Sequence, residues 1–122
     1  MPKVTYNSKL NDLTFIAFDV ETTGLSPVAN RLVELSGVKF SYDSAKVETF
    51  SELIDPEMPI PPEVTRIHGI TDEMVDGKPT VARVIPAFLD WIGDDSVLIA
   101  HNAPFDLEFM RVNIARLGLG CP

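Results

Sequence analysis

The sequence predicts an α/β fold in which helices pack against one mixed β-sheet. Apolar stretches of strand length occupy residues 13–20, 31–40 and 46–54. Apolar residues then recur at helical spacing from 81 to 92, and a short apolar stretch at 96–100 precedes a second helical pattern. Three strands, a helix, a strand and a helix in this order predict that the fourth strand runs parallel to the first.

The first strand is expected from Leu13 to Val20. Its nearly continuous apolar character predicts a central strand that is buried on both faces. Because side chains alternate along a strand, Phe15 and Ala17 share a face with Asp19, and Ile16, Phe18 and Val20 share the other. The strand thus carries an acidic residue where it ends.

The next two strands form an expected antiparallel hairpin. A short polar connection at 41–45 joins residues 31–40 to residues 46–54, and such connections are typical of hairpins. The segment that follows is interrupted by prolines and predicts only short helical turns. One of these turns is expected to begin at Thr71, since Asp72 and Glu73 supply acids to its first turn.

A longer helix is expected after Thr80, which is a suitable N-cap residue. Its apolar positions are Val81, Val84, Ile85, Phe88, Leu89 and Ile92. Pro86 lies within this pattern, so the helix either starts late or bends there.

The last two elements complete the parallel unit. Residues 96–100 predict a short buried strand, and Pro104 opens a helix that Gly118 ends. The expected apolar stripe of this helix is Leu107, Met110, Ile114 and Leu117. A crossover of this kind places the C-terminal ends of the first and fourth strands side by side, where such sheets carry their sites.

Composition limits the possible functions. The chain has 122 residues and a net charge of −8, which disfavours a basic surface laid along a nucleic-acid duplex. No apolar run is long enough to span a membrane, and the N-terminus lacks a secretory h-region. The single cysteine, Cys121, suits the reducing cytoplasm. Residues 1–12 are polar and are expected to form a loose lead-in.

Asp19 and Glu21 are the first candidate site. Both carboxylates point to the same side of the strand, and like charges this close repel unless a cation lies between them. Asp106 leaves the fourth strand on the following helix, and the topology predicts that it lies near them. Three such acids can hold two hard divalent metal ions. The alternatives are solvated acids at a strand end and, for Asp106, a favourable interaction with the helix dipole.

Three motifs carry a family resemblance. D-V-E-T-T-G-L at 19–25, E-V-T-R-I-H-G-I-T at 63–71 and A-H-N-A-P-F-D at 100–106 resemble the DEDDh 3′–5′ exonucleases. They are most similar to the proofreading exonucleases of bacterial DNA polymerase III, of epsilon type or PolC type. The resemblance implies a ribonuclease-H-like sheet of order 3-2-1-4-5. It also implies that Asp19, Glu21 and Asp106 are catalytic and bind two Mg²⁺ or Mn²⁺ ions.

The same resemblance implies a pocket for the 3′-terminal nucleotide, formed by Thr22, Gly24, Leu25, Glu63, His68 and Asn102. Leu25 would pack against the terminal base. Taken alone, His68 more often caps a backbone group, and Glu63 is an ordinary acid at a helix start. Asn102 is a fair N-cap for the last helix, and with His101 it could serve only to organise the loop before Asp106.

One feature departs from the family pattern. DEDDh enzymes carry a separate H-x-x-x-x-D, which supplies the general base and a fourth ligand. Here His68 is followed by Glu73 at that spacing, and His101 by Asp106, an acid already counted among the three. We therefore expect residues 1–122 to be the N-terminal part of one exonuclease domain, lacking the fifth strand and having little activity by itself. The fourth strand is then an exposed edge, and we expect it to promote self-association.

The sequence is also compatible with two alternative functions. The intact enzyme is expected to act on the 3′ end of single-stranded or frayed DNA beside a polymerase catalytic subunit or domain, and not at a membrane. An RNA-trimming member of the family is one alternative, because discrimination of the 2′-OH depends on fine contacts. A catalytically inactive module that binds a metal, a nucleotide or a polymerase is the other.

Overall fold

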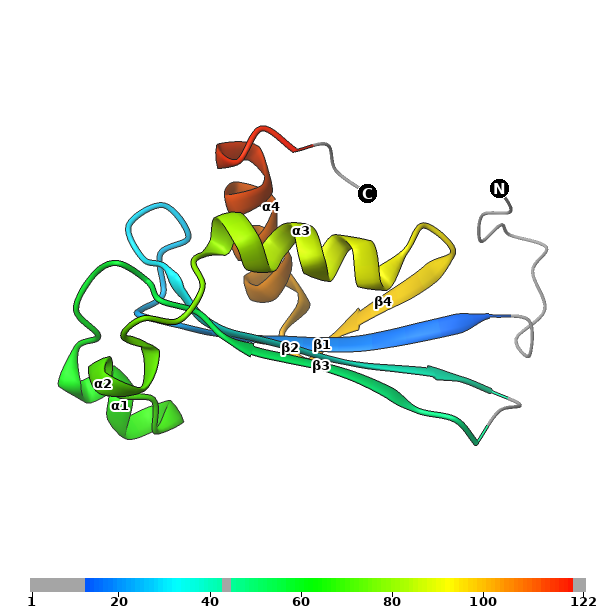
Figure 1. Ribbon diagram of the computed structural model, residues 1–122, viewed down its shortest axis with the longest axis horizontal. Coiled ribbons are helices and arrows are strands. Elements are labelled where there is room, and N and C mark those ends of the chain that lie inside the picture. The colour runs from blue at the N-terminus through cyan, green and yellow to red at the C-terminus, as the bar shows by residue number, and fades with distance from the viewer. Residues whose placement is uncertain (1–12, 43–44, 120–122) are drawn as a thin grey trace.

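The computed structural model describes residues 13–42 and 45–119 (Figure 1). The predicted lead-in at 1–12 and Cys121 lie outside the described residues. The four strands are β1 (Thr14–Thr22), β2 (Leu32–Ser41), β3 (Glu48–Leu53) and β4 (Ser96–Ala100). The helices are α1 (Pro62–His68), α2 (Asp72–Val75), α3 (Val81–Ile92) and α4 (Ala103–Arg116).

The strands form one mixed sheet in the order β3-β2-β1-β4, which confirms the first four positions of the predicted order. β1 pairs antiparallel with β2 and parallel with β4, and β2 pairs antiparallel with β3. The predicted hairpin and the predicted parallel fourth strand are therefore confirmed. β1 runs through Glu21 to Thr22, so both candidate acids lie within the strand.

The core lies between one face of this sheet and the two long helices. Figure 1 shows α3 and α4 on the same side, while α1 and α2 lie at the end where β1 and β3 finish. The core cluster joins Ile16, Phe18 and Val20 of β1 to Val84, Ile85, Phe88 and Ile92 of α3 and to Phe109, Met110 and Ile114 of α4. Burial of these apolar side chains stabilises the arrangement.

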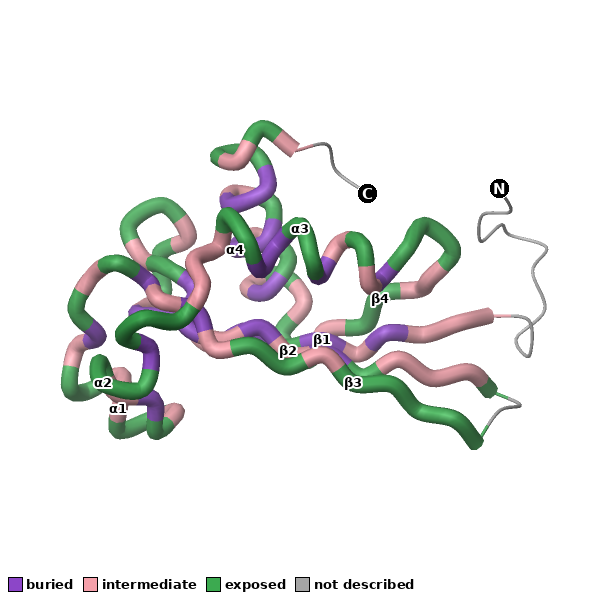
Figure 2. The backbone as a smooth tube through the Cα atoms, viewed as in Figure 1, coloured by how far each residue is buried: buried purple, intermediate pink, exposed green. Residues whose placement is uncertain are grey.

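Among the described elements, no long helix covers the other face of the sheet, and two burial predictions for the strands are wrong. β1 was expected to be buried on both faces, but Asp19 is exposed and Ala17 is only partly buried. β4 was expected to be buried, yet Leu98 and Ile99 are exposed. Strand sequences this apolar do not reveal whether helices cover both faces, and Figure 2 shows the exposed positions along the sheet.

Local signals explain where the helices begin and end. Thr71 caps α2, since its side chain accepts a hydrogen bond from the Met74 N–H. Thr80 occupies the N-cap position of α3 but makes no side-chain capping bond, and Pro86 is accommodated within that helix. Gly118 has φ 72°, a left-handed conformation suited to glycine, and follows α4 as predicted.

Candidate active site

The end of β1 presents Asp19 and Glu21 on the face of the sheet opposite the core. Burial alternates along the strand, with Phe18, Val20 and Thr22 buried, Asp19 exposed and Glu21 partly buried. Glu21 faces Glu34 of β2 in the register of the sheet, and Asp19 faces Ser36. Glu34 was not among the predicted site residues, although the register of the predicted hairpin could have placed it opposite Glu21.

The parallel pairing of β4 brings the third acid to the same end of the sheet. Ala100, the last residue of β4, pairs with Phe18, one residue before Asp19. The chain then enters α4 at Ala103 and places Asp106 in its first turn. Asp106 is only 1% exposed, which is unusual for a carboxylate.

One oxygen of this carboxylate has no protein partner. Asp106 Oδ2 is buried and has no hydrogen-bond partner among the described residues. A buried acceptor without a partner is costly, and more so when the group is ionised. A cation at this oxygen would remove the cost.

The pKa values show that the three acids act on one another. Burial raises the pKa of Glu21, and the Asp19 carboxylate raises it further. The neighbouring His68 lowers it, while Glu34 and Asp106 raise it. Burial likewise raises the pKa of Asp106, as does Asp19, and a hydrogen bond with the Asn102 backbone and the nearby His101 lower it. Negative charge is therefore concentrated here beyond what the protein itself compensates.

The chain turns sharply after Glu21, and short hydrogen bonds fix the turn. The Thr22 hydroxyl donates to the Gly24 carbonyl oxygen (2.5 Å) and accepts from the Gly24 N–H (3.3 Å). A Cβ on Gly24 would lie 2.6 Å from Asn30 Oδ1, so a larger residue here would force the Asn30 side chain to move. The next residue, Leu25, is 84% exposed, which leaves its side chain free to meet a ligand.

Thr23 ties the same turn to β2 and to the loop before α1. Its backbone N–H donates to the Arg31 carbonyl oxygen (2.9 Å), and its hydroxyl accepts from the Arg31 N–H (3.0 Å). That hydroxyl also donates to the sulfur of Met58 (3.4 Å). Thr23 is fully buried, so the segment after Glu21 is held from both sides.

His68 links the end of α1 to the end of β1. The Ile70 N–H donates to its Nδ1 (3.1 Å), so that nitrogen carries no hydrogen. Nε2 then carries the ring hydrogen and donates to the Thr22 carbonyl oxygen (3.1 Å). Both ring nitrogens are therefore engaged with backbone groups, and His68 anchors the turn that follows Glu21.

The two remaining predicted residues, Glu63 and Asn102, are exposed. Glu63 is exposed in the first turn of α1 and makes no hydrogen bond or ion pair with the residues that the structure describes. Asn102 occupies the N-cap position of α4, as predicted, but its side chain makes no capping bond. It is exposed beside His101, so both side chains are accessible from solvent.

Preformed metal coordination is not seen in the described part of the chain, where no group of three or more His, Cys, Asp or Glu side chains is already placed to hold an ion. The donor chemistry nevertheless fits a hard divalent cation. All three acids offer oxygen ligands, and the unpaired Asp106 Oδ2 lacks only a positive partner.

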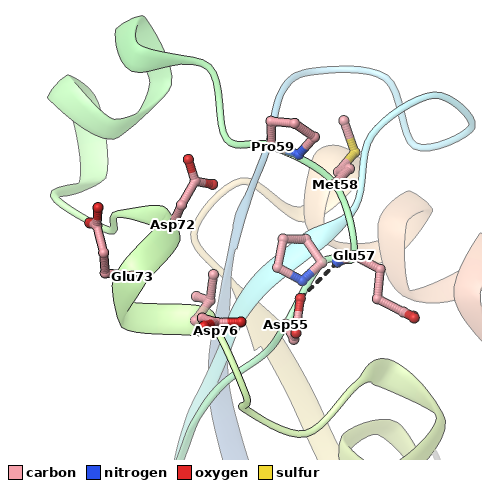
Figure 3. Close-up of a pocket in the computed structure, with 9 residues that line it drawn as sticks. Asp55, Glu57, Met58, Pro59, Asp72, Glu73 and Asp76 are labelled. Carbon is pink, nitrogen blue, oxygen red and sulfur yellow. Dashed lines mark hydrogen bonds between the residues drawn. The ribbon is translucent and has the colours of Figure 1, made fainter.

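A second group of acids lies elsewhere and serves a different purpose. Asp55, Glu57, Asp72, Glu73 and Asp76 line a shallow hollow between the loop at 55–59 and α2 (Figure 3). Asp55 accepts a hydrogen bond from the Glu57 N–H (2.9 Å), and Asp72 accepts one from the Ile60 N–H (2.9 Å). Asp55 and Asp72 therefore bind loop backbone, whereas Asp106 Oδ2 has no hydrogen-bond partner among the described residues.

Comparison with known proteins now places the chain in a family. The family model described as RNase_T, Exonuclease, matches residues 16–122. The chain belongs to the RNase_T exonuclease family. Its curated relatives include PolC-type DNA polymerase III of Halalkalibacterium halodurans, 41% identical over 120 residues, and of Streptococcus suis, 44% identical over 119 residues. These alignments cover 96% and 95% of this chain but 8% of each relative.

Solved structures agree with this exonuclease fold. A product-bound exonuclease I superposes with a TM-score of 0.79 at 20% identity, covering 88% of this chain and 26% of that one. Escherichia coli exonuclease I in complex with a dT13 oligonucleotide gives 0.77 at 21% identity, covering 88% and 24%. The chain thus spans about a quarter of these structures, and its sheet matches the ribonuclease-H-like arrangement of the exonucleases.

Proposed function

We propose that this RNase_T exonuclease chain carries the metal-binding carboxylates of a proofreading 3′–5′ exonuclease. The intact enzyme would hydrolyse the 3′-terminal phosphodiester of DNA and release nucleoside 5′-monophosphates. The observation that carries the proposal is the buried Asp106 Oδ2, which has no hydrogen-bond partner among the described residues and belongs to a carboxylate that interacts electrostatically with Asp19 and Glu21. A scaffold without a ligand gains nothing from such a group.

Asp19, Glu21 and Asp106 would hold two Mg²⁺ or Mn²⁺ ions. Such ions would supply an activated water and stabilise charge on the phosphodiester oxygens. The chain's own contribution is geometric. β1 fixes Asp19 and Glu21 on a paired strand, and the first turn of α4 fixes Asp106 in a buried position. Rigid elements of this kind hold ligands more accurately than loops.

The surrounding residues would receive the terminal nucleotide. The tight turn at Gly24 leaves Leu25 exposed beside Glu21, where an apolar side chain can pack against a base. Glu63 and Asn102 are exposed and can offer polar contacts. Because both nitrogens of His68 bind backbone, we assign it to shaping the pocket by way of the Thr22 carbonyl oxygen.

The 122 residues alone are proposed to have little exonuclease activity, and to form one part of a single exonuclease domain. The only H-x-x-x-x-D in the sequence runs from His101 to Asp106 and uses an acid already assigned above. The hydrogen bonds of His68, the other histidine, leave it no free nitrogen for proton transfer. General acid–base catalysis contributes roughly 10²- to 10⁴-fold in rate, so a chain without a separate histidine base would be slow.

The proposed substrate is the 3′ end of single-stranded or frayed DNA, and the proposed partner is a polymerase catalytic subunit or domain in the cytoplasm. The relatives named PolC-type DNA polymerase III and the exonuclease I complex with dT13 support this choice. In the described part of the chain, no helix has the length and apolar character needed to cross a bilayer. RNA trimming remains the alternative substrate class.

Metal binding by the purified chain tests the proposal directly. Mn²⁺ is titrated while paramagnetic broadening of backbone amide signals is recorded, and broadening is expected around residues 19–21 and 103–106. Asp106→Asn should weaken Mn²⁺ binding by at least about tenfold, since even outer-shell changes often cost that much. Asp72→Asn, within the acidic hollow of Figure 3, is the matched control and should leave the affinity unchanged.

The outcomes separate the competing functions. Mn²⁺ that broadens only the acidic hollow around α2 would refute the proposed site. Binding at Asp19 and Asp106 with no digestion of DNA or RNA by the 122 residues agrees with an incomplete exonuclease. Strong Mg²⁺-dependent digestion by the purified chain would overturn the proposed inactivity. An inactive binding module is supported if an enzyme that contains the whole domain also fails to digest either polymer.

A further inference from the structure

We propose that Glu34 is a fourth carboxylate of the candidate site, where it positions a water molecule on the metal ion that Glu21 would bind. This inference rests on the proposed function and adds to it a residue that lies outside the three family motifs. The register of the sheet sets Glu34 of β2 directly opposite Glu21 of β1. Residues opposite each other in a sheet share a face, so Glu34 points to the side that carries Asp19 and Glu21.

The backbone on either side of Glu34 is held firmly. Its neighbours Val33 and Leu35 are both fully buried, and the Val33 carbonyl oxygen accepts a hydrogen bond from the Ile54 N–H (2.8 Å). The pairing of β1 with β2 changes register just after the Glu21–Glu34 pair, and such irregularities are common beside active sites. The place of Glu34 is thus fixed by β1, β2 and the chain after β3, and it does not depend on β4 or on any strand added beside β4.

Glu34 has no compensating cation in the described part of the chain. Its side chain makes no hydrogen bond or ion pair with the residues described there. Lys78 lines the same hollow as Glu34 but forms no ion pair with it. Because like charges directly opposite each other destabilise a sheet, the Glu21–Glu34 pair favours a bound cation at this position.

A separate observation also points to a cation at this end of the sheet. Asp106 is 1% exposed, and its Oδ2 has no hydrogen-bond partner among the described residues. Glu21 interacts electrostatically with Asp106 and with Glu34. The two partners belong to opposite sides of β1, since α4 follows β4 and Glu34 lies on β2. A cation bound by Glu21 and Asp106 would therefore also feel the charge of Glu34.

The chemistry of hard divalent ions gives Glu34 its role. Mg²⁺ usually keeps several water molecules when it binds to a protein. Carboxylates that do not touch the ion can accept hydrogen bonds from such waters and orient them. Glu34 is only partly buried and shares a hollow with His68, where water has room. His68 cannot take this role, because both of its ring nitrogens bind backbone groups.

The Mn²⁺ affinity of the 122-residue chain tests this role. Glu34→Gln keeps the shape and removes the charge, and we expect it to weaken binding about tenfold, the lower end of what outer-shell changes cost. Glu52→Gln is the matched control, because Glu52 lines the same hollow but lies opposite Leu35. Long-range effects of the lost charge are screened at about 0.15 M salt, so Glu52→Gln should change the dissociation constant less than about twofold.

Electron paramagnetic resonance of bound Mn²⁺ separates a water-positioning residue from a direct ligand. The number of waters on the ion should be the same in the wild type and in Glu34→Gln, whereas an additional water in the variant would show direct ligation and overturn the proposed role. With a chelator, Glu34→Gln should be at least as stable as the wild type, since it removes a like-charge pair. If this variant does not fold, Glu34→Asp keeps the charge, withdraws the carboxylate and should also weaken Mn²⁺ binding.

The failure of this inference is distinguishable from failure of the proposed function. If Mn²⁺ binds around residues 19–21 and 103–106 and Glu34→Gln weakens it no more than Glu52→Gln does, only the role of Glu34 is refuted. If Mn²⁺ does not bind there in the wild type, the proposed site and the role of Glu34 are both refuted.

Discussion

Replacing Asp106 with asparagine should stabilise the metal-free protein, which is the opposite of what most buried substitutions do. The carboxylate is 1% exposed, its Oδ2 has no partner in the described structure, and its pKa is raised by burial and by Asp19. Leaving such a group unsatisfied costs about 1–3 kcal/mol. Asparagine keeps the shape and removes the charge, so we expect a gain of about 1 kcal/mol.

Thermal unfolding in the presence of a chelator measures this effect. A change of about 1 kcal/mol corresponds to a shift in Tm of roughly 4 °C for a domain of this size. With Mn²⁺ the order should reverse, because the wild-type chain gains stability from binding and Asp106→Asn does not. Asp72→Asn is the matched control, since Asp72 is exposed and already accepts a hydrogen bond from the Ile60 N–H.

The decisive result is that Asp106→Asn is the more stable protein with a chelator, whereas the wild type is the more stable protein with Mn²⁺. If Asp106→Asn lowers the Tm of the chelated protein, then the carboxylate contributes to the fold and its unpaired oxygen carries no cost. If the wild-type Tm does not respond to Mn²⁺, the carboxylates do not act as ligands in this chain. Either outcome would refute the reasoning that joins the buried acid to a metal.

Three other changes follow from the same structure. Glu21 and Asp106 have raised pKa values, so their contribution to stability is complete below the ordinary carboxylate pKa near ~4 and is lost as pH rises through the raised values. Without metal, mild acidification should therefore raise the Tm of the wild type relative to the Tm of Asp106→Asn. His68→Ala removes two hydrogen bonds and should cost about 1–2 kcal/mol in urea unfolding, whereas exposed His101→Ala should cost under about 0.5. Gly37→Ala places a Cβ 2.9 Å from a tryptophan ring atom and should cost about 1–3 kcal/mol, with a change in tryptophan fluorescence.

The strands were predictable because hydrophobic pattern and turn residues agree along the first part of the chain. β4 was predicted at its observed bounds, 96–100, and its parallel pairing followed from the intervening helix. Exposure was not predictable in the same way. Phe15 stacks on Phe40 at 5.6 Å on the uncovered face, so an aromatic pair occupies a surface that the pattern assigned to a buried core.

Helix α4 shows how an apolar stripe can be partly wrong. Met110 and Ile114 are buried as predicted, but Leu107 is exposed, and the buried positions also include Asp106, Phe109 and Asn113. Asn113 is buried because its Nδ2 donates to the Phe109 carbonyl oxygen (2.8 Å) within the helix. Two polar residues on the inner face, Asp106 and Asn113, were thus missed, because periodicity counts only apolar side chains.

The topology behind the candidate site was predictable, whereas the hydrogen bonds around it were not. β4 pairs parallel with β1 and leads into α4 as expected, which puts Asp106 in the first turn of the helix that follows the neighbouring strand. A shared metal site of Asp19, Glu21 and Asp106 stays a prediction. The hydrogen bond from His68 to the Thr22 carbonyl oxygen joins residues far apart in sequence, so no local pattern indicated it. Glu34 faces Glu21 through the strand register, which the sequence gives only once the hairpin alignment is known.

Binding of the proposed metal ion would be linked to folding. Burial and then Asp19 raise the pKa of Glu21, Glu34 and Asp106 raise it further, and His68 lowers it, so the carboxylate is less easily ionised in the native state. A proton or a metal ion would each neutralise this group, and the two would compete for the same carboxylate oxygens. A cation that binds only the native state must therefore stabilise it most at neutral pH, where few protons compete. Stability of the chain and occupancy of its site should then rise together.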